Sequence, residues 1–406
     1  MKKQKILIRL ARAMGGVLLV VGSTLVMPGA VADQSPVTQM PAIKSNKVVS
    51  SLLQDIVRVD NRLVVVGERG HIALSDDHGK TWQQANVPTR QMLNAVYFVD
   101  NKQGWAVGYD GLILNTVDGG MNWNIQLDGL KFTRQRMADN IPVLDAQIKE
   151  LQQKKTSAEA VLADAEAQGQ QDNSKLEDAV SALEDKLSKL EADRDDAKAA
   201  ITSDTVANPL MDVWFRDDKT GFAVGAFGEF LKTTDGGLTW ASIGDRLENS
   251  ERNHLNAITG LGNVMYIVGE AGKLYRSTDG GQKWALLPSP DSENGSFFAV
   301  NIIDAEHVII GGLRGAIYRS SDNGNSWKQV PEDLHKNMNC IFFAGNDTVL
   351  AVGNDGALLR SRDGGLTFMS HVRKNRLTIA SVVEAADGSY VMVGMGGVQK
   401  IQANSL

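Results

Sequence analysis

Cysteine is almost absent from this chain. Cys340 is the only cysteine among 406 residues, which excludes an intramolecular disulfide, so packing must hold the fold together. Because Cys340 lies in the apolar stretch 339–343, a buried thiol is favoured over a reactive one. The six histidines are scattered, and no metal-ligand spacing, phosphate-binding loop or nucleophile elbow occurs. We therefore expect no enzyme activity, no cofactor and no metal site.

Net positive charge is lacking as well. The formal net charge is −6 at pH 7. An acidic protein is a poor partner for nucleic acid, because the phosphate backbone repels it. A nucleic-acid-binding function is therefore not expected.

One apolar run stands out near the N-terminus. The first 32 residues combine five basic side chains, an apolar run over 17–26 and the small residues Ala30-Val31-Ala32. This pattern predicts a signal peptide over 1–32 that is cleaved after Ala32, and a periplasmic mature chain of net charge about −11. An uncleaved membrane anchor is disfavoured, because the run is shorter than the ~20 residues that a span needs.

An eight-residue box, Ser/Thr-x-Asp-x-Gly-x-x-aromatic, recurs six times. The copies span residues 75–82, 116–123, 233–240, 277–284, 320–327 and 361–368. Their final aromatic residues are 41, 117, 44, 43 and 41 residues apart. A period of roughly 40–45 residues is typical of a β-propeller with one blade per repeat, and the long step marks an insertion. The Asp of each box is expected to accept hydrogen bonds within its own turn, which is a structural role.

A Gly-x-x-Gly turn recurs seven times. The copies begin at residues 67, 108, 225, 269, 312, 353 and 394. Short apolar runs flank each turn, which predicts a connection between second and third strands with glycines at positive φ. Seven turns predict an all-β, seven-bladed propeller of four-stranded blades. The last copy ends at Ile401 without a box, so we predict that Val37–Pro41 closes the ring by pairing with its third strand.

The long step holds a segment of different composition. Aromatic residues vanish from 133–203, and apolar residues follow 4-3 steps over 144–165 and again over 176–201. This predicts an antiparallel coiled-coil hairpin with a turn at 168–173 and Ser174 as N-cap. Because Lys155 and Arg194 interrupt the seam, two interpretations remain open: a hairpin packed on the rim, or a docking arm for a partner.

The predicted organisation has four parts. These are a signal peptide (1–32), a closing strand with blades 1 and 2 (33–132), the helical hairpin (133–203) and blades 3 to 7 (204–406).

One basic position recurs just before the boxes. Four consecutive blades carry Lys232, Arg276, Arg319 and Arg360 there. Blade symmetry would place these cations in an arc suited to a carboxylate-bearing peptide or an anionic surface, so we predict partner binding at them. The alternative is a set of solvated cations at strand ends that pair with nearby carboxylates.

The repeat over 94–123, with Gly104-Trp-Ala-Val-Gly108 ahead of the box, resembles the photosystem II stability and assembly factor family of seven-bladed propellers. Residues 212–240 repeat the match. The resemblance implies binding of a membrane-protein assembly intermediate through an arginine-rich patch, for which the four basic positions above are the counterparts. It also implies relatives in non-photosynthetic proteobacteria, commonly beside transporters of the resistance-nodulation-division type. The helical insertion departs from the photosynthetic pattern.

Two functional hypotheses follow. The first is a non-catalytic periplasmic scaffold or assembly factor for an inner-membrane protein complex, with such a transporter as the candidate partner. The second is a glycan-binding or sialidase-like glycoside hydrolase propeller, because the boxes resemble the Asp-boxes of sialidases. The second lacks support in the central turns, which carry no paired carboxylates of the kind a glycosidase needs.

Overall fold

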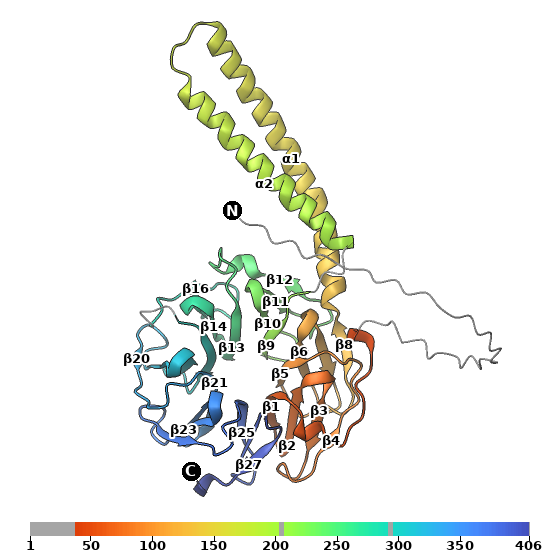
Figure 1. Cartoon of the computed structure of the whole chain (residues 1–406), viewed down its shortest axis with the longest axis vertical. Helices are drawn as coiled ribbons and strands as arrows, with labels where there is room; N and C mark the ends of the chain where they lie inside the picture. The colour runs from red at the N-terminus through yellow and green to blue at the C-terminus, as the bar shows by residue number, and fades with distance from the viewer. Residues whose placement is uncertain (1–36, 203–206, 291–294, 406) are drawn as a thin grey trace, which may run out of the picture. The chain divides into compact units, whose positions relative to one another are not determined.

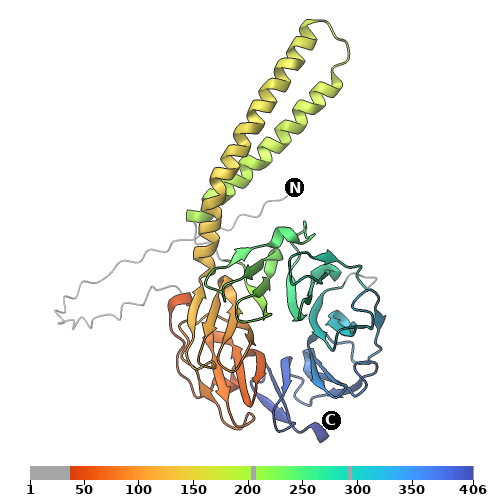
Figure 2. The same ribbon diagram turned by 180° about the vertical axis from the view of Figure 1, so that it is seen from behind.

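Seven antiparallel sheets follow one another along the chain and lie in a circle (Figures 1 and 2). The computed structural model describes residues 37–202, 207–290 and 295–405, so the predicted signal peptide lies outside the described residues. We call the sheets blades 1 to 7. In the described residues six blades have four strands and blade 7 has three, so the prediction of four-stranded blades holds for six of the seven.

The strands of blades 1 to 3 are β1 (Leu53–Val59), β2 (Arg62–Gly67), β3 (Ile72–Ser75), β4 (Gln83–Gln84), β5 (Leu93–Phe98), β6 (Gly104–Gly108), β7 (Ile113–Thr116), β8 (Asn124–Leu127), β9 (Leu210–Phe215), β10 (Gly221–Gly225), β11 (Phe230–Thr233) and β12 (Ala241–Ser242). The strands of blades 4 to 7 are β13 (Leu255–Leu261), β14 (Val264–Gly269), β15 (Leu274–Ser277), β16 (Ala285–Leu286), β17 (Phe297–Ile302), β18 (Val308–Gly312), β19 (Ile317–Ser320), β20 (Lys328–Gln329), β21 (Met338–Gly345), β22 (Thr348–Gly353), β23 (Ala357–Ser361), β24 (Met369–Val372), β25 (Ile379–Glu384), β26 (Tyr390–Gly394) and β27 (Gln399–Ile401). The 3-10 helices are η1 (Val37–Gln39), η2 (Val48–Ser50), η3 (Glu68–Gly70), η4 (Tyr109–Gly111), η5 (Ala226–Gly228), η6 (Gly244–Arg246), η7 (Glu270–Gly272), η8 (Leu313–Gly315), η9 (Asn354–Gly356) and η10 (Ala403–Ser405).

Apolar packing joins neighbouring blades. The first strand of each blade contacts the first strand of the next, and β25 contacts β1. Each of the seven interfaces has its own cluster of buried apolar side chains. Since a fully buried aliphatic side chain contributes about 1.5–3 kcal/mol, these clusters replace the disulfides that the chain lacks.

The Gly-x-x-Gly turns lie between second and third strands, as predicted, but their two glycines have different roles. The second glycine has positive φ, for example 69° at Gly70. The first has an extended backbone, and a Cβ on Gly67 would overlap the carbonyl oxygen of Leu52. In six of the turns the residue directly before the second glycine also has positive φ, for example 56° at Arg69. The prediction of positive φ therefore holds for the second glycine only, and close backbone approach explains the first.

The two ends of the chain meet without sharing a sheet. Val37–Gln39 forms η1, and the following residues lie against blade 1, where the Ala42 N–H donates to the Val87 carbonyl at 2.9 Å. The prediction that Val37–Pro41 pairs with the last blade is therefore wrong. The physical reason is that packing of β1 against β25 already closes the ring.

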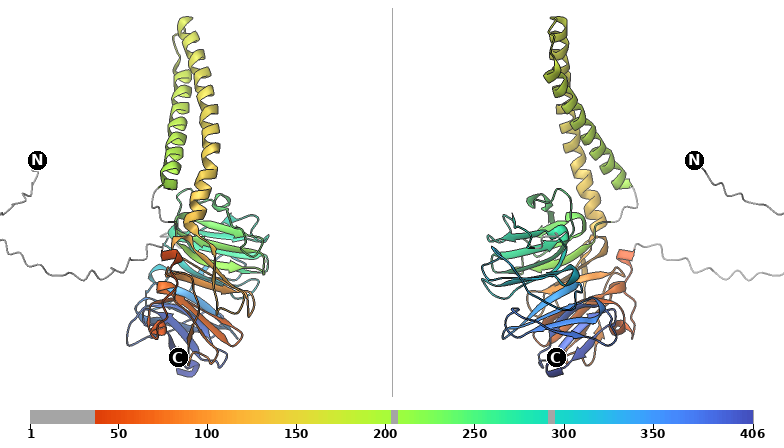
Figure 3. Two further views of the ribbon diagram at one scale, coloured as in Figure 1. Left: turned by 90° about the vertical axis from the view of Figure 1, so that its right-hand side faces the viewer. Right: turned by 60° about the vertical axis from the view of Figure 1, so that its left-hand side comes forward.

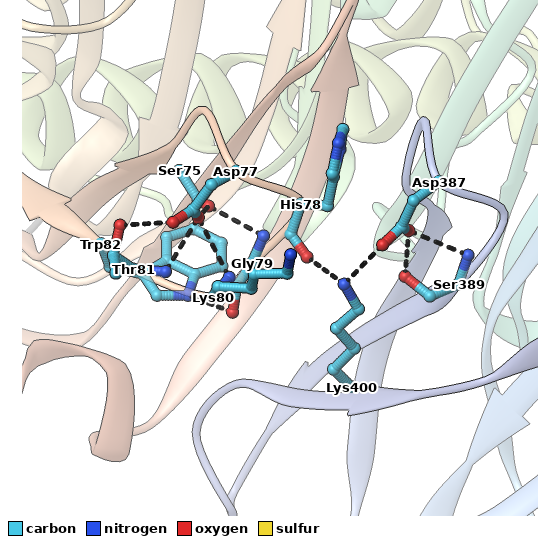
Figure 4. Close-up of polar contacts among 10 residues, drawn as sticks. All are labelled: Ser75, Asp77, His78, Gly79, Lys80, Thr81, Trp82, Asp387, Ser389 and Lys400. Atoms are coloured by element: carbon cyan, nitrogen blue, oxygen red, sulfur yellow. Dashed lines mark hydrogen bonds and ion pairs between the residues drawn. The ribbon is translucent and has the colours of Figure 1, made fainter.

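Polar contacts reinforce this closure. Lys400 of blade 7 donates to the carbonyl of His78 in the first box at 2.7 Å and to Asp387 at 2.8 Å (Figure 4). Arg58 of blade 1 donates to the Glu384 carbonyl of blade 7 at 2.9 Å.

Two long helices lie side by side between blades 2 and 3 in sequence (Figure 3). α1 (Gly129–Ala167) has 39 residues and α2 (Ser174–Thr202) has 29, so α1 is roughly 60 Å long. α1 begins ahead of the expected boundary at Thr133, because the Asp128 side chain caps it by accepting from the Lys131 N–H at 3.2 Å. Ser174 is the first residue of α2, not its cap, and Asp172 accepts from its N–H and hydroxyl.

Cross-helix ion pairs explain the two cations in the predicted seam. Lys155 pairs with Glu184 of α2 at 2.9 Å, and Arg194 pairs with Asp145 of α1 at 3.8 Å. These pairs favour one register of the hairpin. Because all four side chains are partly exposed, each pair contributes little to stability.

We expect Lys400→Met to lower the free energy of unfolding by about 1–2 kcal/mol, because it removes two hydrogen bonds at the ring closure. Urea unfolding would measure the change. Lys374→Met is the matched control, since Lys374 is exposed. Equal stability of both variants would show that apolar packing alone closes the ring.

Candidate functional site

The six boxes use their carboxylates inside their own turns. In the first box, Asp77 accepts from the Thr81 N–H at 2.8 Å, from the Thr81 hydroxyl at 2.7 Å and from Ser75 at 2.8 Å (Figure 4). The bonds from the Thr81 backbone and side chain hold the pKa of Asp77 well below its usual range. The other five boxes repeat the pattern. These carboxylates are structural, as predicted.

The fourth residue of a box offers its carbonyl oxygen to the preceding blade. The donors and acceptors are Arg62 to Gly119 at 3.0 Å, Gln126 to Gly236 at 2.9 Å, Arg276 to Asn323, Arg319 to Gly364 at 2.8 Å and Lys400 to His78 at 2.7 Å. Five of the seven interfaces thus share one polar contact at the same position. Its donors come from three different strand positions, so no repeat in the sequence shows it.

The predicted basic arc takes part in this network. Arg276 and Arg319 reach the box of the next blade, and Arg360 donates to the Ala403 carbonyl at 2.7 Å. The Lys232 ammonium lies 5.4 Å from the centre of the Phe222 ring, and burial lowers its pKa. All four side chains are half-buried. They occupy equivalent positions, as predicted, and hydrogen bonds give Arg276, Arg319 and Arg360 a structural role. Partner binding at the four positions stays a prediction.

Amide side chains on the first strands link the blades along the central channel. The bonds run from Asn94 Nδ2 to the Leu210 carbonyl at 2.8 Å, from Asn256 Nδ2 to Phe297 at 2.8 Å and from Asn339 Nδ2 to Ile379 at 2.9 Å. Each bond crosses from one blade to the next. These amide groups therefore form a polar belt along the channel wall, on the inner side of the apolar interfaces.

Two carboxylates lie in the same belt. Asp55 accepts from the Val96 N–H at 3.0 Å, and Asp212 accepts from the Ile258 N–H at 2.8 Å, in each case from the following blade. The ring encloses both side chains, although they stay partly accessible from the channel. Burial raises the pKa of Asp55 to about 6 and that of Asp212 to about 7, against the opposing effect of these hydrogen bonds.

Sequence reasoning missed these two carboxylates. Each stands one residue after the bulged position of a first strand, where other blades have Ala, Cys or Ser. An Asp inside an otherwise apolar first strand was the available signal. Cys340 occupies the same register, and burial raises its pKa to about 11, which agrees with the expected unreactive thiol.

A cavity of about 580 Å³ opens at the turn end of the channel. Tyr109, Met211, Phe298 and Met395 are among the residues that line it. The Tyr109 and Met395 side chains are 45% and 61% exposed. The lining of the cavity is both polar and apolar. Amide side chains of the channel belt lie below a rim of apolar side chains.

The base of the helical hairpin is tied to blade 3 beside the turns. Arg136 of α1 pairs with Glu229 at 2.9 Å and donates to the Ser242 hydroxyl at 2.9 Å. The Gly129 backbone lies against Gly111 of η4. The turns and the hairpin base therefore share one side of the ring, and the boxes lie at the other strand ends, as predicted.

Neither a metal site nor a membrane-spanning helix emerges from the described ranges. No group of three or more His, Cys, Asp or Glu side chains in them could hold a metal ion. No helix in this part of the chain is long and apolar enough to cross a membrane.

A family model described as "Photosynthesis system II assembly factor YCF48" matches residues 74–141 and 195–341, which is more than half of the chain. The gap between the two matched ranges lies within the helical hairpin. A comparison with curated proteins gave no match.

Several solved structures are similar in fold. A structure of YCF48 bound to a D1 peptide has 15% identity and a TM-score of 0.55, covering 89% of this chain and 98% of that one. YCF48 from Cyanidioschyzon merolae has 16% identity and a TM-score of 0.58, covering 87% of this chain and 97% of that one. A GH74 enzyme from Niastella koreensis has 11% identity and a TM-score of 0.55, covering 86% of this chain and 52% of that one. At these identities the likeness shows the fold alone.

We expect the charge reversal of Arg276, Arg319 and Arg360 to Glu to lower the free energy of unfolding by about 2–4 kcal/mol. The new carboxylates would face carbonyl oxygens that now accept hydrogen bonds. The control is the reversal of the exposed Arg362, Lys374 and Arg376, which should change stability little. Equal urea midpoints for the two triple variants would contradict the structural role of the arc.

We also expect stability to fall as pH rises from about 4 to 8. The folded-state pKa values of Asp55 and Asp212, about 6 and about 7, exceed the ordinary value of 3.8. In this window the folded state holds more protons than the unfolded state, so the free energy of unfolding decreases with pH. Because both side chains are partly accessible, we expect a loss of about 1–3 kcal/mol.

The double variant Asp55→Asn, Asp212→Asn would test this expectation in urea unfolding at about pH 4.5, 6 and 8. Its stability should depend less on pH than that of the wild type. Parallel pH dependences would show that other groups cause the decline.

Proposed function

Since the chain belongs to the family of the photosynthesis system II assembly factor YCF48, we propose that it is a non-catalytic, protein-binding scaffold. In this proposal it acts in the periplasm and assists the assembly of an inner-membrane protein complex, with a transporter of the resistance-nodulation-division type as the candidate. The structure of YCF48 bound to a D1 peptide supports a protein segment as the ligand.

The proposal rests on the helical hairpin, because its residues contribute nothing to the apolar clusters of the ring as described. Among the described residues, none of the seven interface clusters includes a residue from 133–202. Leu144, Ile148 and Ala197 are the buried apolar side chains of this range. Val143 and Val161 are 51% and 55% exposed. A long helical pair with a fixed base and exposed apolar side chains suits contact with a partner.

The base contacts support a docking arm with a defined anchor. Glu229, which pairs with Arg136, has a side chain only 10% exposed, and Asn208 also donates to it at 3.3 Å. An ion pair that is largely shielded from solvent and further hydrogen-bonded is more strongly oriented than a surface pair. The base of the hairpin is thereby held beside blade 3.

We expect the ring to fold when a short Gly/Ser linker replaces residues 133–202, since the seven clusters remain complete. The melting temperature should change by only a few degrees. Affinity purification of tagged mature protein from its own membranes should recover an integral membrane protein with the wild type and at least tenfold less of it with the linker variant.

The control is Arg136→Ala, which keeps both helices but removes the anchor to Glu229. It should reduce recovery less than the deletion does. Full recovery by the linker variant would show that the hairpin is not the docking arm, and no membrane protein recovered by the wild type would contradict the scaffold function itself.

A further inference from the structure

All seven first strands have a β-bulge at the same place. In each blade the pairing of the first strand with the second skips one residue. A β-bulge redirects the side chain of the extra residue. These seven extra residues, here called the bulge ring, line the cavity of about 580 Å³ at the turn end of the channel. The ring has four amide side chains, Gln54, Asn94, Asn256 and Asn339, and three apolar ones, Met211, Phe298 and Ala380.

The next residue of each first strand belongs to a second ring, here called the inner ring. Its members line a further cavity of about 180 Å³, and the bulge ring lines both cavities, so the two spaces are adjacent. Asp55 and Asp212 are the charged side chains among the described residues that line either cavity. The other five members of the inner ring are Ala95, Ala257, Ala299, Cys340 and Ser381. Because these five side chains are small, they leave room beside the two carboxylates.

The two carboxylates face the same space without a cation beside them. Each accepts from the backbone of the following blade, Asp55 from the Val96 N–H at 3.0 Å and Asp212 from the Ile258 N–H at 2.8 Å. No Lys, Arg or His side chain of the described residues forms an ion pair with either carboxylate. Burial raises the pKa of Asp212, and the charge of Asp55 adds to this effect. A bound cation would offset the repulsion between the two carboxylates.

The amide groups of the bulge ring add unused acceptors. Asn94, Asn256 and Asn339 each donate through Nδ2 to a carbonyl oxygen of the next blade. No described group donates to the Oδ1 atoms of these three side chains. An amide oxygen accepts from N–H and O–H groups, so the channel wall favours a ligand that carries hydrogen-bond donors.

Apolar side chains surround the entrance to this space. Tyr109 and Met395 lie at its rim and are 45% and 61% exposed, and Met211 and Phe298 belong to the bulge ring below. An apolar entrance above carboxylates suits a cation on an aliphatic chain. A metal ion fits less well, because Ca²⁺ and Mg²⁺ require about six or more ligands and two carboxylates on separate blades supply few of them.

We propose that the central channel binds a primary ammonium group on a short aliphatic chain. A free amine or the lysine side chain of a protein would supply this group. The three N–H groups of the ammonium would donate to Asp55, Asp212 and nearby amide oxygens, and the aliphatic chain would contact Met211 and Phe298. The site is distinct from the helical hairpin, so either proposal stands if the other fails.

The test follows the methionine methyl groups of the mature wild-type chain by NMR after isotope labelling of these groups. n-Pentylamine, which is a cation at about pH 7 as lysine is, should shift the signals of Met211 and Met395 in the cavity lining. The signal of Met369, on the outer strand of blade 6, should stay in place. The neutral 1-pentanol, which has the same chain length, should bind at least tenfold more weakly.

Two double variants complete the test. Asp55→Asn, Asp212→Asn should weaken binding of n-pentylamine at least tenfold. The matched control is Asp218→Asn, Asp245→Asn, which removes the same charge from exposed positions and should bind as the wild type does. The comparison of the amine with the alcohol needs no variant, so a misfolded channel variant would not decide the outcome.

A short Gly-rich peptide with one central lysine identifies the source of the ammonium group, with a norleucine peptide as its neutral counterpart. Binding of n-pentylamine without binding of the lysine peptide would assign the site to a free amine. Tighter binding of the lysine peptide would assign it to a protein side chain. Both results agree with an ammonium site.

Three outcomes would overturn the inference. The first is equal affinity for n-pentylamine and 1-pentanol, which would show that the charge is not recognised. The second is unchanged affinity of Asp55→Asn, Asp212→Asn for the amine. The third is a shift of the Met211 signal by calcium chloride at lower concentration than by the amine, which would assign the channel to a metal ion.

Discussion

The whole structure depends on apolar packing between neighbouring blades, most critically where the two ends of the chain meet. Within residues 37–405, as far as the structure describes them, no sheet takes strands from both ends, so blade 7 is joined to blade 1 there through side chains and a few polar contacts. Leu53 and Leu63 pack with Val391 and Val393 there, and all four are at most 1% exposed. Any change that loosens this interface opens the ring, because no backbone ladder spans it.

A second layer of polar contacts orients the packed blades. Box carbonyls accept from the preceding blade, and channel amides and carboxylates bond to the following strand. Such contacts are directional, so they set the rotation of one blade against the next, which apolar packing alone does not do. Several charged residues that look functional in isolation, including the Asp of each box and Arg319, serve this purpose.

The features that break the repeat are the better candidates for function. The helical hairpin occurs once, and Asp55 and Asp212 stand where the other blades have Ala, Cys or Ser. Repeated contacts are sufficient to explain the ring, and five blades pack without a carboxylate at this position. The two features also differ in chemistry, since the hairpin offers apolar side chains on helices whereas the channel offers carboxylates.

The sequence by itself determined the repeat count, the turn and box positions and the helical insertion. These features depend on local backbone preference and on periodic residue patterns, which can be recognised without knowledge of the tertiary contacts. It also separated structural box carboxylates from a catalytic pair, since six copies around a ring cannot converge on one site. Only the tertiary structure decided how the ring closes, where Arg276 and Arg319 point, and that Asp55 and Asp212 share the channel with raised pKa values. Each of these depends on which residues of different blades come into contact. Such long-range contacts produce no repeating pattern in the sequence.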